Sequence, residues 1–345
     1  MAFFKFSNIS SLTGLAALIL IAGWFFLGPE GEIKKTAVEM GPIAKSMVNA
    51  TGSPSSIMPS GYPLQPRQQG LFAGWSGSGD RVAPGLVSFP QFGGQRRQRA
   101  DYDPTYRNGV PNWKISKGFQ YDEFRFVRVK YQSYGRTRWG QKWAIDAPDS
   151  DLNFSFRLQQ LTSLKVNPDP IYLELTDDRI FDYPFMYMIE PGDIALSQEE
   201  ANAMRHYLNN GGFIMVDDFW GQWEWQDFED AMKMVFPNKS YVELELDHPV
   251  FHCVYDLKKK PQCPAIGNFE RTGETSDRPW DPTAREVHYR GYYDDKDRLC
   301  MIACFNTDLG DGWEREGESE FYFKRFSEKE AYPMGINIVV YAMTH

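Results

Sequence analysis

Residues 184–218, PFMYMIEPGDIALSQEEANAMRHYLNNGGFIMVDD, contain the pattern that decides the fold of this chain. Two short apolar runs, 184–189 and 213–216, flank a segment with the residue pattern of a helix. Short apolar runs without polar alternation are typical of strands that are buried on both faces, and such strands belong to parallel sheets. The stretch therefore predicts a β-α-β unit.

The helix of this unit has clear boundary signals. Ser197 and Glu200 have the spacing of a capping box, in which each side chain binds the backbone N–H of the other residue. We expect the helix to cover about 198–209. Gly211 and Gly212 follow it, and glycine adopts the left-handed conformation of a helix end without a steric penalty.

Carboxylate residues follow both predicted strands. Glu190 comes after the first strand, and Asp217 and Asp218 come after the second. Ligands of open α/β sheets bind beyond the carboxyl ends of the strands, so these residues are candidate catalytic groups. They could form an acid–base pair or bind a divalent metal, or they could instead cap helices and pair with arginines. Strand alternation points Asp217 and Asp218 to opposite sides, so we expect one of them to face a ligand.

The chain after residue 115 alternates between strand and helix patterns, which predicts a layered α/β domain. We expect three layers, with a mostly parallel sheet flanked by helices. The stretch FRFVRVKY at 124–131 alternates apolar and basic residues, which favours a first strand near a sheet edge. Further strands are predicted over 171–175, 241–246, 287–293 and 299–305, and further helices over 151–164, 224–236 and 332–343.

An apolar run covers residues 12–27, and Lys5 precedes it. The run is shorter than the roughly 20 residues that a membrane span usually needs. Bulky residues at 24–27 stand where a signal-peptide cleavage site needs small ones, so an uncleaved anchor is favoured over a cleaved signal peptide. An anchor in the inner membrane would leave the bulk of the chain periplasmic or extracytoplasmic.

The composition between the apolar run and the domain is rich in Gly, Pro, Ser and Gln. Such a segment cannot bury enough apolar surface to offset its chain entropy, so it favours a disordered linker. We therefore expect three parts: a signal anchor or signal peptide over 1–28, a linker over 29–115 and an α/β domain over 116–345.

Charge is distributed unevenly along the chain. Residues 1–115 carry a net charge of +5 and the remainder carries −14, which gives −9 in total. An acidic folded part argues against nucleic acid as a partner. Cys300 and Cys304 would be about 13 Å apart on one strand, too far for a disulfide. Cys253 and Cys263 could pair or remain free thiols.

The patterns above resemble the class I glutamine amidotransferase-like fold, which is a flavodoxin-like architecture. The phrase LDHPV at 246–250 is similar to a segment of the trehalose-utilisation-like branch of that fold. The chain from about 120 to 345 also resembles an uncharacterised bacterial family, a domain of unknown function with that fold. The segments that carry this similarity are YPFMYMIEPG, GGFIMVDDFWG, DHPVFHCVYDL, REVHYRG, FNTDLGDGWE and YPMGINIVVYAMTH. The resemblance implies a fold and a cell-envelope setting, and it implies no reaction.

The sequence departs from true amidotransferases at the nucleophile. Those enzymes carry a cysteine on a sharp turn after the strand that follows the Gly-Gly pair. Here residues 217–221, DDFWG, occupy that turn without a cysteine or serine. We therefore expect no glutamine amidotransferase activity.

Histidines and arginines of the domain provide further candidates. His288 and Arg290 share one side of a predicted strand, where His288 could assist catalysis and Arg290 could bind a ligand. A salt-bridged strand face is the alternative. His248 is a candidate ligand-binding residue, but Pro249 follows it and no HExxH motif is present, so a hydrogen-bonded loop role is favoured.

Asp308 lies in NTDLGDGWE at 306–314, directly after an apolar strand. The density of Asp, Asn and Gly is compatible with a calcium loop, yet EF-hand spacing is absent, so a structured turn is favoured. Asp308 remains a candidate ligand-binding residue. No metal ligand set and no cofactor are predicted.

Tryptophans are frequent near these polar loops, and an indole ring can stack on the apolar face of a sugar. Trp220 and Trp313 are therefore candidate ligand-binding residues, with core packing as the alternative. A third interpretation places Trp280 and Trp313 in a protein–protein interface.

Two functional hypotheses follow. The leading one is a membrane-tethered, extracytoplasmic binding or scaffolding module of the cell envelope, with an envelope protein or glycan as partner. The alternative is a carboxylate-based hydrolase, which could be metal-dependent, that acts on a glycan or another envelope polymer. Convergence of the candidate carboxylates in space would favour the hydrolase.

Overall fold

The structure is a computed structural model that describes residues 102–115, 123–135 and 141–345. The predicted anchor and residues 29–101 of the predicted linker lie outside the described residues. Residues 102–115 contact the domain: Arg107 forms an ion pair of 3.0 Å with Asp169, and the Trp113 indole donates to the Val166 carbonyl at 2.8 Å. None of the helices in the described ranges is long and apolar enough to span a bilayer.

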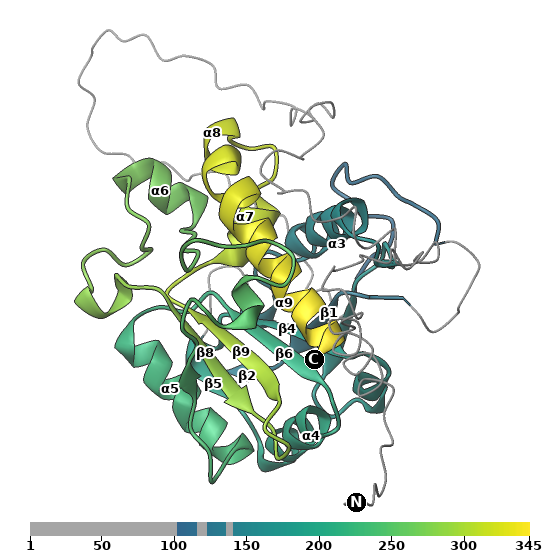
Figure 1. The fold of residues 1–345 in the computed structure, drawn as a ribbon, viewed down its shortest axis with the longest axis vertical. Helices are drawn as coiled ribbons and strands as arrows, with labels where there is room; N and C mark the ends of the chain where they lie inside the picture. The colour runs from purple at the N-terminus through teal and green to yellow at the C-terminus, as the bar shows by residue number, and fades with distance from the viewer. Residues whose placement is uncertain (1–101, 116–122, 136–140) are drawn as a thin grey trace, which may run out of the picture. The chain divides into compact units, whose positions relative to one another are not determined.

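A seven-stranded sheet forms the centre of the domain (Figure 1), with the order β3-β1-β4-β6-β9-β8-β7. The first five strands in this order are parallel, and β8 is antiparallel to both of its neighbours. Numbered along the chain, the parallel strands have the order 2-1-3-4-5. The strands are β1 (Val127–Lys130), β3 (Ile171–Glu174), β4 (Phe185–Ile189), β6 (Phe213–Asp217), β7 (Val242–Glu243), β8 (His288–Tyr293) and β9 (Leu299–Phe305); β2 (Gln132–Ser133) pairs separately with β5 (Ile194–Ala195).

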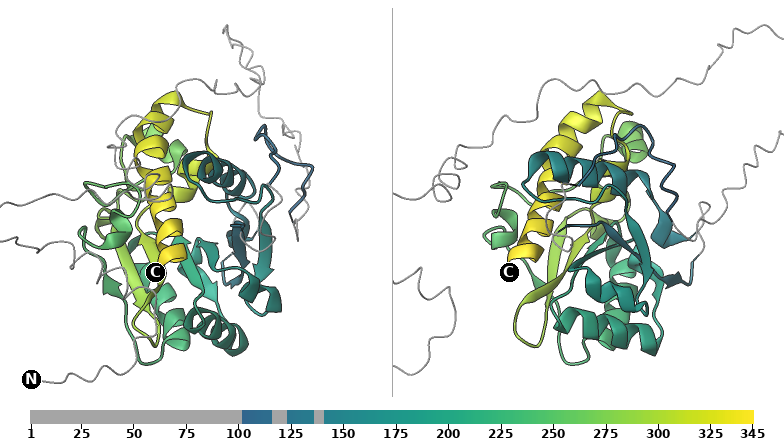
Figure 2. Two further views of the ribbon diagram at one scale, coloured as in Figure 1. Left: turned by 45° about the vertical axis from the view of Figure 1, so that its right-hand side comes forward. Right: turned by 90° about the vertical axis from the view of Figure 1, so that its right-hand side faces the viewer.

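Helices cover both faces of the sheet (Figure 2). On one face pack α3 (Asp149–Leu161), α7 (Leu309–Glu314) and α9 (Tyr332–Thr344). On the other pack α4 (Gln198–Asn209) and α5 (Gly221–Val235). The prediction of a mostly parallel sheet flanked by helices is confirmed.

Shorter helical segments connect these elements. The segments are η1 (Lys142–Ala144), η2 (Asp178–Asp182), η3 (Pro191–Asp193), η4 (Pro249–Phe251), α6 (Ile266–Thr272), η5 (Pro282–Ala284), α8 (Glu320–Tyr322) and η6 (Phe323–Ala331), the last of which is a π-helix.

Side-chain alternation explains why the central strands are apolar throughout. In β4, Phe185, Tyr187 and Ile189 join the core beneath α3 and α9. Met186 and Met188 join the core beneath α4 and α5. Because both faces are covered, apolar residues are favoured at both sets of positions.

The prediction of a first strand near a sheet edge is confirmed, because β1 is the neighbour of the edge strand β3. β1 lies inside the sheet, between β3 and β4. Its Arg128 is fully buried, and the guanidinium makes two hydrogen bonds, of 3.1 and 2.5 Å, with the Asp151 carboxylate of α3. A buried arginine is tolerated when a carboxylate pairs with it, so a basic residue within an alternating strand does not have to face solvent.

The predicted boundaries of α4 are confirmed. The Ser197 hydroxyl accepts the Glu200 N–H at 3.2 Å, and the Glu200 carboxylate accepts the Ser197 N–H at 2.8 Å. Gly211 follows with a φ of +100°. A Cβ on Gly212 would lie 2.3 Å from the Tyr207 ring, so glycine is also needed there for close packing.

Two other predictions require revision. The strand predicted over 241–246 is only two residues long in β7. The turn predicted over 306–314 contains the helix α7, because the Asp308 side chain accepts the Asp311 N–H at 2.7 Å and caps it. The thiols of all four cysteines are free, so Cys253 and Cys263 do not form a disulfide in this structure.

Candidate functional site

Eight carboxylate side chains come together at the carboxyl edge of the parallel strands. Burial is the largest cause of a raised pKa for every one of them, and neighbouring carboxylates raise it further for most. We call this group the carboxylate cluster. Its members are Asp146, Glu190, Asp217, Asp218, Asp277, Asp308, Asp311 and Glu314.

Sharp backbone turns place several of these side chains. Glu190, Asp218 and Asn306 follow β4, β6 and β9 with φ values of +47°, +55° and +60°, and Asp146 has +62°. A non-glycine residue in this left-handed region costs about 1–2 kcal/mol. Four of the six such residues in the described ranges lie at this one edge, and strained backbone of this kind clusters at functional sites.

Asp218, Asp277 and Asp308 form the first trio of the cluster. Oxygen atoms of the three carboxylates all lie within 4.8 Å of one another. Within the described ranges, no lysine, arginine or histidine forms an ion pair with any of the three. Burial raises the pKa of Asp277 to about 7, and burial followed by repulsion from other carboxylates raises the pKa of Asp218 and Asp308 well above its usual value.

Neighbouring donors orient each member of the first trio. The Trp220 indole donates to Asp218 at 2.9 Å, and the Ala265 N–H donates to Asp277 at 2.9 Å. Asp308 accepts the α7 N–H described above. A carboxylate has about four acceptor sites, so each side chain keeps capacity for a further ligand.

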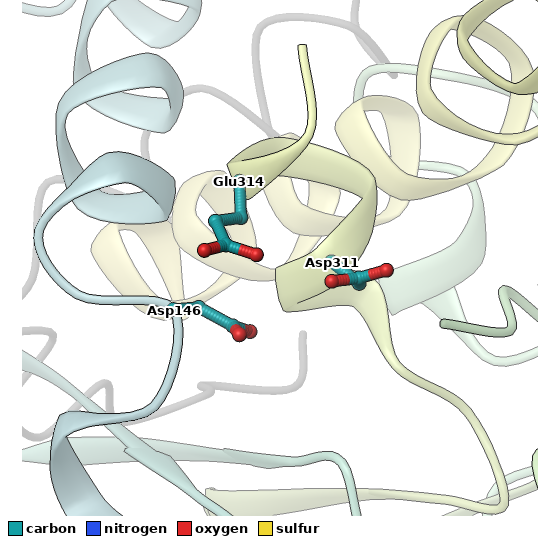
Figure 3. Close-up of side chains that lie close together, drawn as sticks. All are labelled: Asp146, Asp311 and Glu314. Atoms are coloured by element: carbon teal, nitrogen blue, oxygen red, sulfur yellow. The ribbon is translucent and has the colours of Figure 1, made fainter. Parts of the chain in front are cut away.

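Asp146, Asp311 and Glu314 form the second trio, again with oxygen atoms within 4.8 Å of one another. Figure 3 shows Asp146 and Glu314 facing each other, with Asp311 beside them on α7. Arg315 contacts Glu314 at 2.6 Å and Asp311 at 3.3 Å. Burial raises the pKa of Glu314 to about 7 despite this ion pair.

Asp217 lies against the core side of the cluster and is fully buried. Its Oδ2 accepts the Tyr187 hydroxyl at 3.0 Å and the Gly310 N–H at 2.9 Å. Its Oδ1 has no hydrogen-bond partner among the described residues. Burial raises its pKa to about 7. Asp217 therefore binds the backbone of α7, while Asp218 belongs to the first trio.

Glu190 lies at the rim of the cluster. Lys142 approaches it at 3.6 Å, yet burial raises the pKa of Glu190 to about 7. The Tyr131 hydroxyl donates to the Glu190 carbonyl at 2.7 Å and so fixes the turn that carries this side chain.

Three predicted site residues are engaged elsewhere. His288 and Arg290 each lie 3.3 Å from Glu243 on β7, and the Arg290 guanidinium stacks 3.9 Å above the Trp225 ring. These contacts match the salt-bridged strand face. His248 accepts the Val250 N–H at 3.2 Å and caps η4, as the loop interpretation predicted.

The tryptophans divide between core and surface. Trp313 is fully buried and packs on Phe154 with ring centroids 4.4 Å apart, which matches the core-packing alternative. Trp220 is also buried but reaches the site through Asp218. Trp223 and Trp280 are 77% and 71% exposed, which leaves their rings free for a partner.

Four members of the cluster were not found from the sequence. Asp146 and Asp277 lie in connecting segments without periodicity, so no local pattern distinguishes them from other loop carboxylates. Asp311 and Glu314 did carry a signal. They repeat the three-residue spacing that begins at Asp308, and this spacing places side chains on one face of a helix.

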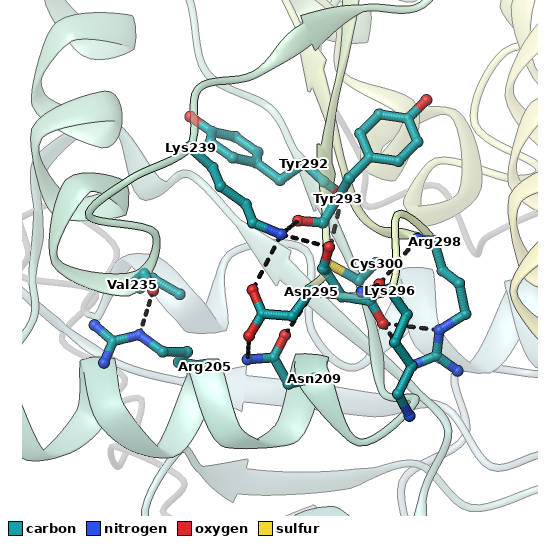
Figure 4. Close-up of polar contacts among 11 residues, drawn as sticks. Arg205, Asn209, Val235, Lys239, Tyr292, Tyr293, Asp295, Lys296, Arg298 and Cys300 are labelled. Atoms are coloured by element: carbon teal, nitrogen blue, oxygen red, sulfur yellow. Dashed lines mark hydrogen bonds and ion pairs between the residues drawn. The ribbon is translucent and has the colours of Figure 1, made fainter.

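The opposite edge of the sheet is occupied by structural contacts (Figure 4). Lys239 donates to the Tyr293 carbonyl at 3.2 Å and pairs with Asp295 at 3.1 Å, and Asn209 donates to Asp295 at 2.9 Å. A cavity of about 30 Å³ lies there beside Arg298, with room for little more than water. These contacts fasten the β8–β9 turn to α4.

Comparison with known proteins identifies the family and leaves the activity open. No curated protein matches the sequence. Residues 125–343 match the family described as a domain of unknown function, DUF4159, and this range covers more than half of the chain and contains the whole carboxylate cluster. The predicted similarity to a domain of unknown function is confirmed, and the chain belongs to the DUF4159 family.

Proposed function

We propose that this domain binds a divalent cation through Asp218, Asp277 and Asp308. Three carboxylates within 4.8 Å of one another repel strongly unless a cation or protons neutralise them. Oxygen donors of this kind suit Ca²⁺, Mg²⁺ or Mn²⁺. The observation that carries the proposal is that three separate chain segments bring these side chains together, while no cation among the described residues forms an ion pair with them.

Two further observations support this location. Fully buried Asp217, which precedes Asp218 in the chain, has an oxygen without a hydrogen-bond partner among the described residues, and such an atom is costly unless something satisfies it. The trio also lies beyond the carboxyl ends of β6 and β9, where open α/β sheets bind their ligands.

The strand order supports the finer fold assignment. An order of 2-1-3-4-5 among the parallel strands is that of flavodoxin-like folds, to which we assign this domain in its amidotransferase-like form. Asp218 occupies the turn after β6 where amidotransferases carry their nucleophile. The site would therefore bind a cation where its relatives in fold bind a substrate, and glutamine hydrolysis is not expected.

The cellular setting remains the one that the sequence predicts. We place the domain outside the cytoplasm, tethered to the inner membrane by the apolar run over 12–27, as a binding module of the cell envelope. The exposed rings of Trp223 and Trp280 support a glycan or envelope protein as its partner.

A hydrolase is the second candidate, and Glu190 favours it. A carboxylate with a pKa of about 7 is suited to accept a proton from water at neutral pH. The first trio would then supply a cation that polarises the substrate. Release of reducing ends from cell-wall glycans, lost in Glu190→Gln but with cation binding retained, would identify this activity.

Thermal unfolding of the full chain in detergent tests the cation site. After treatment with a chelator, Ca²⁺, Mg²⁺ and Mn²⁺ are added separately. A cation at a hundred times its dissociation constant stabilises the folded state by about 2.7 kcal/mol, so the midpoint rises. Asp277→Asn keeps an acceptor for the Ala265 N–H but removes a charge, and we expect it to weaken binding at least tenfold.

Asp256→Asn is the matched control, because Asp256 is an exposed carboxylate that pairs with Lys258 and His252 and belongs to neither trio. It should respond to cations as the wild type does. If no cation raises the wild-type midpoint, or if Asp277→Asn responds as fully as the control, the proposed function is wrong.

A further inference from the structure

We infer that Asp146, Asp311 and Glu314 form a second divalent-cation site beside the first. The inference deepens the proposed function, on which it rests for the neighbouring site. Oxygen atoms from the three side chains lie within 4.8 Å of one another, the same limit that holds for the first trio. Figure 3 shows that the side chains come from two separate segments of the chain.

The backbone presents these three side chains in a fixed arrangement. Asp311 and Glu314 lie one turn apart on α7, so they share a face of that helix. Asp146 reaches them from the connection between η1 and α3, where its φ of +62° turns the chain sharply. A left-handed aspartate persists only where surrounding contacts hold it.

Charge balance leaves room for a divalent cation. Three carboxylates carry −3 when ionised, and Arg315 is the cation that contacts this trio among the described residues. Arg315 also contacts Glu318 at 3.3 Å. Arg128 lies in the vicinity, but its guanidinium is bound by Asp151. The trio therefore keeps about two negative charges that a divalent cation would neutralise.

An unsatisfied oxygen points to the ligand independently of the charge. The Oδ2 atom of Asp146 is shielded from solvent, and no hydrogen-bond partner faces it in the described ranges. It lies 2.7 Å from the position that a Cβ on Gly310 would occupy, so a larger residue at 310 would clash with this oxygen. A buried carboxylate oxygen without a donor is expected to have a ligand.

The two sites are joined through α7. Asp308 belongs to the first trio, and its carboxylate accepts the N–H of Asp311, which belongs to the second. A cation on Asp308 therefore orders the first turn of the helix that carries Asp311 and Glu314. Binding at one site should strengthen binding at the other, because the ordering of α7 is shared.

Stoichiometry of Mn²⁺ binding tests the inference. Equilibrium dialysis of the full chain in detergent, after removal of metals by a chelator, should give two equivalents for the wild type. Glu314→Gln should give one equivalent, and Asp277→Asn should also give one. Glu318→Gln is the matched control, because Glu318 contacts the same Arg315 but lies outside the trio, and it should retain two.

The outcomes separate the two proposals. A wild type with one equivalent that survives Glu314→Gln but not Asp277→Asn overturns the second site and keeps the first. One equivalent lost only in Glu314→Gln overturns the first site and keeps the second. No binding by the wild type overturns both. Circular dichroism checks the fold of each variant, and Asp146→Asn replaces Glu314→Gln if the latter does not fold.

Discussion

The Asn306 side chain stabilises the edge of the sheet that carries the carboxylate cluster. Asn306 is fully buried, and its φ is +60°. Its amide accepts the Gly221 N–H at 2.9 Å and donates to the carbonyls of Thr283 and Glu286 at 2.9 and 2.6 Å. Asn306→Ala removes all three bonds and puts alanine in the left-handed region. We expect urea unfolding to show a loss of about 2–4 kcal/mol.

Asn209→Ala is the comparison for that experiment. Asn209 also uses its side chain to bind Asp295, but this contact is exposed, so water can replace the lost bond. The expected loss is below about 1 kcal/mol. Equal losses in the two variants would show that Asn306 does not fix the turns as described.

Among individual residues, the sequence predicted half of the carboxylate cluster. Glu190, Asp217, Asp218 and Asp308 were found because they follow apolar strands, and the ends of parallel strands meet at one edge. Side chains such as Asp277 reach the edge through irregular loops, whose path depends on tertiary contacts. His288 was a candidate because strand alternation places it on the same side as Arg290. The same alternation turns its side chain toward Glu243.

The helix α4 is the element whose stability is easiest to test. Its capping box satisfies two N–H groups that would otherwise lack partners. Ser197→Ala removes the hydroxyl acceptor, and we expect a loss of about 1 kcal/mol in the free energy of unfolding. Ser197→Asp retains an acceptor and should stay close to the wild type. A Ser197→Ala variant with an unchanged free energy of unfolding would contradict the capping role.

Elements with internal signals were predicted well. The unit from β4 to β6 combines apolar strands, a capping box and a glycine stop, so local chemistry and tertiary structure agree. β7 and α7 were less predictable for different reasons. β7 is short because pairing with β8 ends after Glu243. α7 forms in a segment with two glycines, Gly310 and Gly312, which disfavour a helix. Packing beneath α3 and η6 stabilises the helix despite this low propensity.

For the whole molecule, the buried carboxylates predict an unusual pH dependence. Glu190, Asp217, Asp277 and Glu314 have pKa values of about 7 in the folded state, against about 4 in an unfolded chain. Between these values the folded state holds more protons than the unfolded state. Stability contributed by these groups is therefore complete below about pH 4 and is lost as the pH rises toward 7.

Thermal unfolding in a chelator at pH 5 and pH 8 tests this expectation. The midpoint should be lower at pH 8, and a divalent cation should restore it there, because ionised carboxylates bind the cation best. His248 acts in the opposite direction, since burial lowers its pKa, but it is one group against four. A chelated protein that is more stable at pH 8 would contradict the account of the cluster.

The fold class could be predicted from the sequence because it rests on periodic patterns that run through the whole domain. The segment that covers the site could not be predicted from the sequence. Residues 261–286 lie over the edge of the sheet and are held there by individual side-chain hydrogen bonds. For example, the Gln262 side chain donates to the Asn306 carbonyl at 3.0 Å, and the Arg278 side chain donates to the Trp220 carbonyl at 2.8 Å. Such contacts join residues that are remote in sequence and leave no local signature.

The distribution of the cluster along the chain has a consequence for biosynthesis. Its members extend from Asp146 to Glu314, and each trio includes residues of the β9–α7 segment. During translation the amino-terminal strands emerge first and can begin to fold. Neither trio exists until α7 has left the ribosome. The two proposed cation sites therefore cannot bind a metal ion until synthesis of the domain is nearly complete.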